Sequence, residues 1–259
     1  MTKPYLSVVI PAYNESQNFR DGLLGPPVDY LQKAKFSYEV ILVNDGSTDD
    51  TKELLESFVR KMVRLGRNFK LLTIKHGGKA MAVTAGMLEA KGDYVLFTDF
   101  DQSTPLYQVE RFLEEHKNGA DIVIGDRDVL KMNNKLLRRF RSWVFLMLVQ
   151  TVLLPGIRDS QCGFKSFSNS YAKKIFNNLS VSRTGKVTGG YMGAFDVEVL
   201  FLGLKLGAKT EQVTVVWDKV EGKRLNPVME PLKMIRDVFK VRIFDLIGKY
   251  DHLSNTAKN

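Results

Sequence analysis

The chain has 259 residues, 44% of them hydrophobic and 26% charged, a composition that suits one large α/β domain and excludes wholesale disorder. Residues 1–128 hold 16 basic and 19 acidic side chains, a net charge of −3, whereas residues 129–259 hold 22 basic and 10 acidic side chains, a net charge of +12. The positive charge of the second half indicates that it has an anionic partner. The single cysteine, Cys162, excludes a disulfide framework and a cysteine-based zinc site, and is expected to be a small buried residue.

Short apolar runs recur through the first half of the chain and predict strands. They are Leu6–Ile10, Val40–Val43, Leu71–Ile74, Tyr94–Thr98 and Ile122–Ile124. Continuous runs of this kind are typical of parallel strands buried on both faces. Helical patterns lie between them, at Asp49–Leu65, Lys79–Lys91 and Pro105–Lys117. The order predicts an α/β fold with a mostly parallel, doubly wound sheet and helices on both faces.

The most polar strand exits in this half are Pro11–Asn14, Asn44–Thr48 and Asp99–Ser103. Parallel strands place their carboxyl ends at one edge of the sheet, and ligands of such folds bind there. These three loops are therefore expected to converge on a binding site.

The second half is less regular. Lys131–Leu154 is predicted to be a helix with basic first turns and apolar later turns, Asp196–Leu206 another helix, and Gln212–Trp217 a strand. From Glu230 to Tyr250 apolar and basic residues fall on opposite helical faces, which is typical of a helix at a membrane surface. The apolar face holds Leu232, Ile235, Phe239, Ile243 and Leu246, and the basic face Lys233, Arg236 and Lys240.

Asp99 and Asp101 follow a predicted buried strand, separated by one residue. Paired carboxylates are hard oxygen ligands, and Mg²⁺ or Mn²⁺ binds through one or two of them together with ligand phosphates. Phosphate-binding loops of the P-loop type and dinucleotide fingerprints are absent from the sequence, and its three histidines are scattered. The pattern favours a metal-assisted reaction of a nucleoside diphosphate.

Several motifs together resemble one family. Ser7–Glu15 (SVVIPAYNE), Ile41–Asp49 (ILVNDGSTD) and Asp99–Asp101 (DFD) are similar to family 2 inverting glycosyltransferases of the GT-A fold. In the second half, Asp159–Lys165, Ala194–Glu198 and Val220–Leu225 resemble the branch of dolichyl-phosphate β-glucosyltransferases and mannosyltransferases. The resemblance runs from about residue 5 to 240. It implies one catalytic domain over 1–245, with a nucleotide-sugar half (1–128) and an acceptor half (129–245), and a C-terminal tail (246–259).

The resemblance also implies a nucleotide-sugar site. Its residues are Pro11, Ala12, Tyr13, Glu15, Asp45, Lys79, Asp99, Phe100 and Asp101. Asp45 would accept hydrogen bonds from the base, or else only form the turn before Gly46; Lys79 would approach the nucleotide, or else be a solvated lysine at a helix start. The metal, Mg²⁺ or Mn²⁺, would be held by Asp99, Asp101 as the main ligand, and the position of Ser103, a poorer ligand than an amide or carboxylate.

The acceptor phosphate is expected to meet a basic group of residues. Arg127 belongs to a Gly-Asp-Arg run that resembles the family's Gly-Ser-Arg, while Arg138, Arg139 and Ser142 share one helical face with Lys135. Asp196 has two interpretations. It is the base that deprotonates an alcohol acceptor, or it is the N-cap of a helix in an enzyme whose phosphate acceptor requires no base.

The implied function is transfer of a sugar, preferably glucose from UDP-glucose, with inversion onto a polyprenyl or dolichyl phosphate. The alternatives are GDP-mannose as donor, and an alcohol acceptor with Asp196 as the base. The sequence shows neither a signal peptide nor a stretch of ~20 apolar residues, so a cytoplasmic protein, peripheral on the cytosolic face of an anionic membrane, is expected. Nucleic acid is excluded as a partner because the aromatic residues lie within apolar helical runs.

Overall fold

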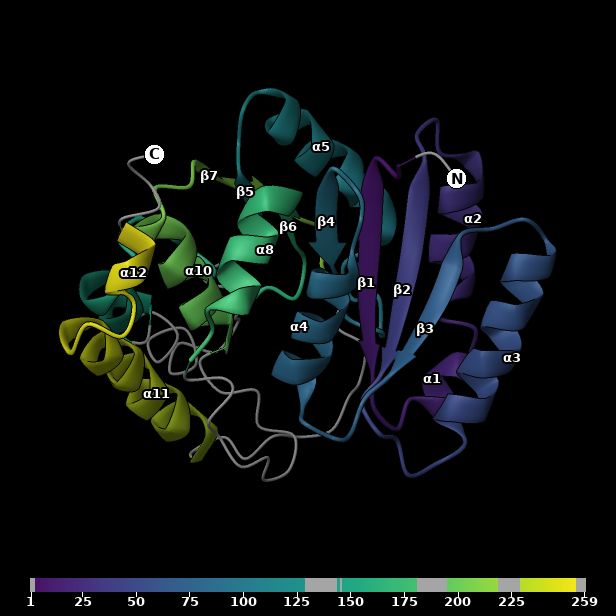
Figure 1. Ribbon diagram of the computed structural model, residues 1–259, viewed down its shortest axis with the longest axis horizontal. Coiled ribbons are helices and arrows are strands. Elements are labelled where there is room, and N and C mark those ends of the chain that lie inside the picture. The colour runs from purple at the N-terminus through teal and green to yellow at the C-terminus, as the bar shows by residue number, and fades with distance from the viewer. Residues whose placement is uncertain (1–2, 129–143, 145, 181–194, 219–228, 255–259) are drawn as a thin grey trace.

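The computed structural model describes residues 3–128, 144, 146–180, 195–218 and 229–254. Its centre is a seven-stranded sheet in the order β3-β2-β1-β4-β6-β5-β7 (Figure 1). The strands are β1 (Leu6–Ala12), β2 (Tyr38–Asn44), β3 (Phe69–Thr73), β4 (Tyr94–Phe97), β5 (Ile122–Asp126), β6 (Lys165–Ser168) and β7 (Thr210–Thr214). All neighbours pair in parallel except β6, which is antiparallel to β4 and β5. The predicted mostly parallel α/β sheet is confirmed.

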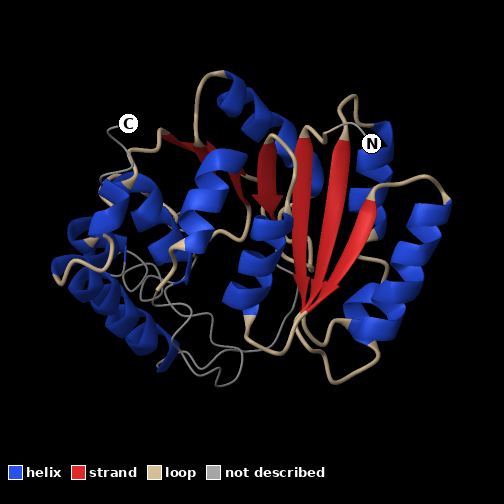
Figure 2. Cartoon of the chain, in the orientation of Figure 1, coloured by secondary structure: helices blue, strands red, loops and turns tan. Residues whose placement is uncertain are grey.

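Helices lie on both sides of this sheet (Figure 2). They are α1 (Ser16–Arg20), α2 (Gly25–Lys33), α3 (Thr51–Arg64), α4 (Lys79–Glu89), the 3-10 helix η1 (Leu106–Gln108), α5 (Val109–Lys117), α8 (Asn169–Asn177), α10 (Phe195–Lys205), α11 (Met229–Leu246) and α12 (Asp251–Ser254). Residues 146–152 are also helical. Helices α3, α4, α5, α10 and α11 were predicted from the sequence, and their observed ends differ by a few residues.

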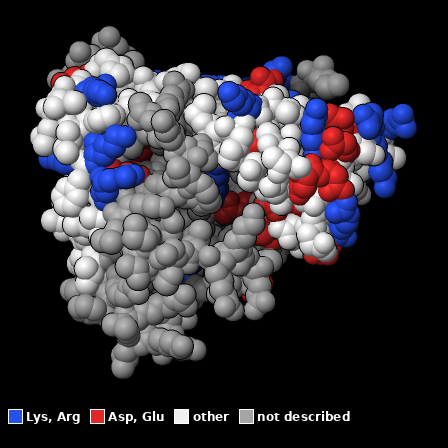
Figure 3. All heavy atoms as spheres, turned by 90° about the horizontal axis from the view of Figure 1, so that it is seen from below, with Lys and Arg blue, Asp and Glu red and all other residues white. Residues whose placement is uncertain are grey.

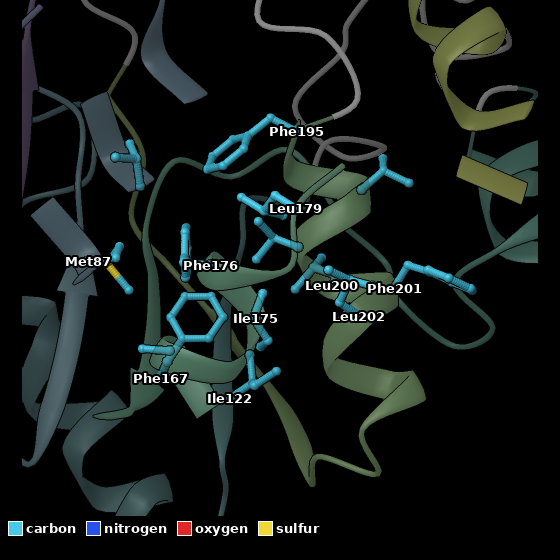
Figure 4. Packing of buried hydrophobic residues seen from close by; sticks show 14 of the residues in the cluster. Met87, Ile122, Phe167, Ile175, Phe176, Leu179, Phe195, Leu200, Phe201 and Leu202 are labelled. Carbon is cyan, nitrogen blue, oxygen red and sulfur yellow. The ribbon is translucent and has the colours of Figure 1, made fainter. Parts of the chain in front are cut away.

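Two hydrophobic cores, one on each face, hold the helices to the sheet. Along β1, Val9 points into the core shared with α4, α8 and α10, whereas Val8 and Ile10 point into the core shared with α2, α3 and α5. Phe167 and Phe176 lie at the centre of the first core (Figure 4), where their rings pack edge to face at 5.6 Å. Burial on both faces explains why the strands appear as unbroken apolar runs.

Strand β6 was not predicted, because its sequence, KSFS, is mostly polar. Lys165 and Ser166 are nevertheless buried. The hydroxyl of Ser166 lies 2.7 Å from Nε2 of His116, and Lys165 Nζ donates to two oxygens, so each polar group has a partner. Satisfied hydrogen bonds allow a polar segment to form an interior strand.

The segment predicted as a C-terminal tail also takes part in the fold. Tyr250 is fully buried, and its hydroxyl donates to Glu198 Oε1 of α10 at 2.8 Å. Leu253 of α12 is buried in the first core. The packed domain therefore extends past residue 245, at least to residue 253.

Candidate active site

The carboxyl ends of β1, β2 and β3 point to one edge of the molecule, at the bottom of Figure 1. There the loops after β1 and β2 are joined by hydrogen bonds. Oδ1 of Asn14 accepts from the backbone N–H of Thr48 at 2.8 Å, and the backbone N–H of Asn14 donates to Ser47 Oγ at 3.1 Å. The backbone N–H of Glu15 donates to Thr51 Oγ1 at 2.8 Å. Two of the three predicted loops are thus held together by hydrogen bonds.

Asp45, at the end of β2, links this surface to the loop before α4. Its side chain is 2% exposed, and its carboxylate oxygens accept hydrogen bonds from the backbone N–H groups of Gly77 (2.7 Å) and Gly78 (2.8 Å). The next residue, Gly46, has a φ of 61°, and a Cβ there would lie 2.7 Å from the backbone nitrogen of His76. Only glycine fits this close approach without strain. Asp45 therefore does more than form the turn.

His76 is a site residue that the sequence did not indicate. Its ring stacks on Tyr13, with ring centroids 4.1 Å apart and an interplanar angle of 20°. Its Nδ1 lies 3.1 Å from its hydrogen-bond partner, the Asp45 carbonyl oxygen, and 2.9 Å from Oδ2 of the Asp45 carboxylate. The contact joins two loops that are distant in sequence, and no sequence motif marks such a histidine.

Lys79 and three predicted aspartates form a second cluster beside these loops. Lys79 begins α4, and its Nζ pairs with Oδ1 of Asp99. Burial by itself lowers the pKa of Lys79, but the carboxylates of Asp99, Asp196 and Asp101 outweigh burial and raise it. The alternative of a solvated lysine is excluded, since the side chain is only 14% exposed. The fold brings the cation at the start of α4 among carboxylates from α10 and from the loop after β4.

The donor atoms around Asp101 fit a hard divalent cation. Oδ1 of Asp101 accepts from the backbone N–H of Ser103 at 2.9 Å, which orients its carboxylate. Oε1 of Gln102 is buried and has no hydrogen-bond partner among the described residues. Among all the residues that the structure describes, no group of three His, Cys, Asp or Glu side chains is arranged to hold a metal ion. Two carboxylates and an unpartnered amide oxygen are a donor set that Mg²⁺ and Mn²⁺ accept.

Two predicted residues of the nucleotide site do not face this edge. The side chains of Ala12 and Phe100 are buried in the core shared with α2, α3 and α5. Both were expected to line the nucleotide pocket. Because the side chains of Ala12 and Phe100 point into the core, only the backbone groups of these two residues can contact a ligand. Pro11, Tyr13 and Glu15 are partly exposed.

Asp196 lies in the first turn of α10, which begins at Phe195, so it is not the N-cap. Its Oδ1 accepts a hydrogen bond from Nζ of Lys165 at 2.5 Å, and that Nζ also donates to the carbonyl of Cys162 at 2.5 Å. Lys165 is fully buried, with Nζ 5.4 Å from the ring centre of Phe97. The carboxylate of Asp196 is therefore part of an ion pair, and its partner Lys165 was not predicted from the sequence as a site residue.

Arg127, predicted to bind the acceptor phosphate, is committed to another partner. Its Nε and a terminal nitrogen donate to the two carboxylate oxygens of Asp159, at 2.7 and 3.0 Å. Burial favours a higher pKa for Asp159, but Arg127 outweighs it and lowers that pKa. The bidentate pair connects β5 with the loop before β6. The other predicted phosphate ligands, Arg138, Arg139 and Ser142, lie outside the described residues.

The loop before β6 also supports the aspartate cluster. A Cβ at Gly163 would lie 2.0 Å from Oδ2 of Asp99, so the backbone of this loop rests on the carboxylate. The neighbouring Cys162 is buried, and burial raises the pKa of its thiol to about 11, as expected for a structural rather than a nucleophilic cysteine. In Figure 3, which views this side of the molecule, acidic atoms gather in a recess near the centre.

The chain is similar to proteins of a known family. Residues 7–176 match the glycosyl transferase family 2 domain. The dolichyl-phosphate beta-glucosyltransferase of Dictyostelium discoideum is 35% identical, in an alignment that covers 94% of this chain and 76% of that protein. The Homo sapiens protein of the same name is 30% identical, with coverage of 98% and 79%.

Solved structures share the fold at low sequence identity. A mycobacterial protein superposes with a TM-score of 0.57 at 20% identity, covering 95% of this chain and 75% of its own. The mannosyltransferase PcManGT of Pyrobaculum calidifontis, solved with GDP-Man and Mn²⁺, has a TM-score of 0.53 at 15% identity and covers 100% and 74%. S. aureus TarS, solved with UDP-GlcNAc, has a TM-score of 0.52 at 17% identity and covers 98% and 71%.

Proposed function

Because the chain belongs to glycosyl transferase family 2, we propose that it transfers a hexose with inversion from a nucleotide sugar to a polyprenyl or dolichyl phosphate. UDP-glucose is the proposed donor, since relatives aligned over nearly the whole chain are named dolichyl-phosphate beta-glucosyltransferases. The observation that carries the proposal is the cluster of Lys79, Asp99 and Asp101 at the carboxyl ends of the strands. Such a cluster is suited to a diphosphate with a divalent cation.

The first half of the chain would hold the donor. Asp99 and Asp101, with the amide oxygen of Gln102, are the residues that would bind Mg²⁺ or Mn²⁺. A bound divalent ion neutralises charge on the nucleoside diphosphate as it leaves. Lys79 stays protonated because acidic neighbours raise its pKa, so it places a second positive charge beside the diphosphate.

The acceptor chemistry follows from the pairing of Asp196. A phosphate monoester has a second pKa of ~6 and is mostly a dianion at neutral pH, so it attacks the anomeric carbon without a base. Asp196 is already bonded to the buried Lys165. This arrangement supports a phosphate acceptor. In that case Asp196 and Lys165 would contribute to the electrostatic potential of the site rather than take up a proton. An alcohol acceptor would instead require Asp196 to take a proton.

A direct assay tests the proposal. Radiolabelled UDP-glucose and GDP-mannose are each offered with a polyprenyl phosphate and Mg²⁺, and the products are extracted into organic solvent. Label from UDP-glucose is expected in the lipid fraction, bound through an alkali-stable, acid-labile sugar phosphate of inverted configuration. If only GDP-mannose gives labelled lipid, the donor is GDP-mannose rather than UDP-glucose. If label is found only on a lipid or saccharide alcohol, the proposed phosphate acceptor is wrong.

Arg138 and Arg139 are proposed to hold the acceptor phosphate. Their replacement by alanine together is expected to weaken use of the lipid phosphate by roughly 10- to 150-fold, because a hydrogen bond to a charged group contributes ~1.5–3 kcal/mol. In steady-state kinetics at varied concentrations of lipid phosphate, we expect the KM for the acceptor to rise and the KM for the donor to stay near that of the wild type. Unchanged kinetics of the double variant would assign the phosphate to other residues.

Helix α11 is proposed to rest on the membrane that carries the lipid. It lies on the side of the molecule to which β1 to β3 point (Figure 1), and its Phe239, Ile243 and Leu246 are exposed, with Leu246 at 71%. Lys240 and Arg242 alternate with these residues along the helix. No helix in the described part of the chain is long and apolar enough to cross a bilayer. Apolar side chains flanked by basic ones favour an anionic lipid surface at the cytosolic face.

Vesicle binding tests the role of α11. Replacement of Ile243 and Leu246 by serine is expected to reduce binding to anionic vesicles at least ~10-fold, since each apolar side chain contributes ~1.5–3 kcal/mol when buried. The matched control replaces Val63 and Leu65, which are similarly exposed at the end of α3. Cosedimentation at rising salt checks the basic contribution of ~1 kcal/mol per engaged Lys or Arg. If both double variants lost vesicle binding equally, the proposed contact between α11 and the membrane would be wrong.

A further inference from the structure

Three ion pairs lie around the proposed reaction site, and one of them has no role yet. The pairs are Lys79 with Asp99, Arg127 with Asp159, and Lys165 with Asp196. The last is the most buried of the three, with side chains that are 0% and 9% exposed. A substrate therefore has little access to Lys165 itself, and any effect of this lysine on the reaction must pass through Asp196.

A buried lysine is an unusual choice for an interior strand. Lys165 begins β6, which pairs with β4 on one side and β5 on the other. Burying two charges costs free energy that their attraction often only just offsets, so an apolar pair of similar volume would stabilise a strand at least as well. Stability alone does not explain why this position carries a lysine.

Asp196 lies within electrostatic range of cations on two sides of the site. Burial lowers the pKa of Lys79, and the carboxylates of Asp99 and Asp196 raise it. Burial also lowers the pKa of Arg127, which Asp159 and, with a smaller effect, Asp196 raise. The charge of Asp196 is thus felt both at the start of α4 and just after β5. Any anion that enters between these elements would be repelled by Asp196 if its charge were not compensated.

We propose that Lys165 is a specificity-determining residue that acts through Asp196: it compensates the charge of this carboxylate and so admits an acceptor phosphate dianion. The inference rests on the proposed function, which supplies the phosphate acceptor. The donor diphosphate would enter with a divalent cation that offsets its charge, whereas the acceptor phosphate brings none. The acceptor is therefore the substrate that is more sensitive to this carboxylate. An uncharged alcohol would not require the lysine, since a lone Asp196 would serve it better as a base.

Steady-state kinetics of the full chain with UDP-glucose, Mg²⁺ and varied polyprenyl phosphate test the proposal. Lys165→Met leaves Asp196 without its partner, so the acceptor KM should rise about 10-fold or more, the scale of repulsion between charges several ångströms apart in a protein. The donor KM should change less. Asp196→Asn removes the negative charge instead and should leave the acceptor KM at or below the wild-type value. Lys165→Met/Asp196→Asn removes both charges and should return the acceptor KM to near that of the wild type.

The contrast between the two single variants separates an electrostatic role from a structural one. Loss of either partner of a buried pair destabilises the fold, so a merely structural pair would give both variants the same defect. The matched control is Lys70→Met, which breaks a partly buried pair with Glu39 at the amino ends of β2 and β3, the opposite edge of the sheet. This variant should keep the wild-type acceptor KM.

Two results would overturn the inference: an acceptor KM that rises in both single variants, or one that does not rise in Lys165→Met. If Lys165→Met does not fold, Asp196→Asn decides, and an acceptor KM above the wild-type value then overturns the inference. Failure of the wild type to glycosylate polyprenyl phosphate at all would instead overturn the proposed function.

Discussion

Asp101→Ala is expected to lower the turnover of sugar transfer by ~10²-fold or more, with the fold intact. Asp101 follows β4, and its carboxylate is oriented by the backbone N–H of Ser103 beside Asp99 and Lys79. Losing one preorganised electrostatic contact to a developing charge costs an enzyme ~10²–10³ in kcat. Turnover with saturating UDP-glucose and polyprenyl phosphate measures the effect.

A matched control and a metal titration complete this test. Asp29→Ala removes an exposed carboxylate on α2, remote from the strand edge, and should keep full activity. Excess EDTA should abolish wild-type transfer, and added Mg²⁺ or Mn²⁺ should restore it. A fully active Asp101→Ala enzyme, or wild-type transfer that persists in EDTA, would show that the metal is not held at this position.

Asp159→Asn is expected to lower the free energy of unfolding by about 3–5 kcal/mol, the cost of breaking a buried ion pair by removing one partner. The Asp159 side chain is 4% exposed and that of Arg127 is 21% exposed, so the guanidinium would keep its charge with little access to water. Asp93→Asn breaks the exposed pair with Lys3 and should cost at most ~1 kcal/mol. Urea denaturation of both variants checks the contrast, and equal losses would contradict it.

The pH dependence of the same variant provides a second measurement. The folded state lowers the pKa of Asp159, because Arg127 outweighs the opposite effect of burial. The carboxylate therefore contributes its full stability above its unfolded pKa of ~3.9, and this contribution is lost as the pH falls through the folded value. The difference in unfolding free energy between wild type and Asp159→Asn should be constant near neutral pH and shrink below about pH 4.

The first half of the fold was predictable because its signals are local. Strands β1, β2 and β4 contain continuous apolar runs, and each of the three is followed by a loop with a recognisable polar motif. Since parallel strands share one carboxyl edge, the convergence of Tyr13, Asp45 and Asp99 followed from order alone. The weaker signals lay in β6 and α8, where the partners that stabilise a polar strand are distant in sequence.

Those distant partners also limited prediction of the site. Lys165 is a functional candidate only because α10 brings Asp196 within 2.5 Å of its Nζ. Arg127 appeared to be free for a phosphate, since the sequence does not reveal that Asp159 lies opposite it. Ala12 and Phe100 fall in recognisable motifs, yet their side chains point into the core. Pairings and side-chain directions of this kind depend on tertiary contacts rather than local pattern.

The position of β6 has a consequence for how the protein is made. Strands β4 and β5 are consecutive in the chain, yet β6, which is synthesised later, lies between them. While residues 1–128 alone have left the ribosome, β4 and β5 each present an unpaired edge, and exposed edges promote association between chains. The strand that closes this gap also carries Lys165. The nascent sheet therefore becomes continuous between β4 and β5 only after β6 has emerged, and the pair with Asp196 becomes possible only after the start of α10 has emerged.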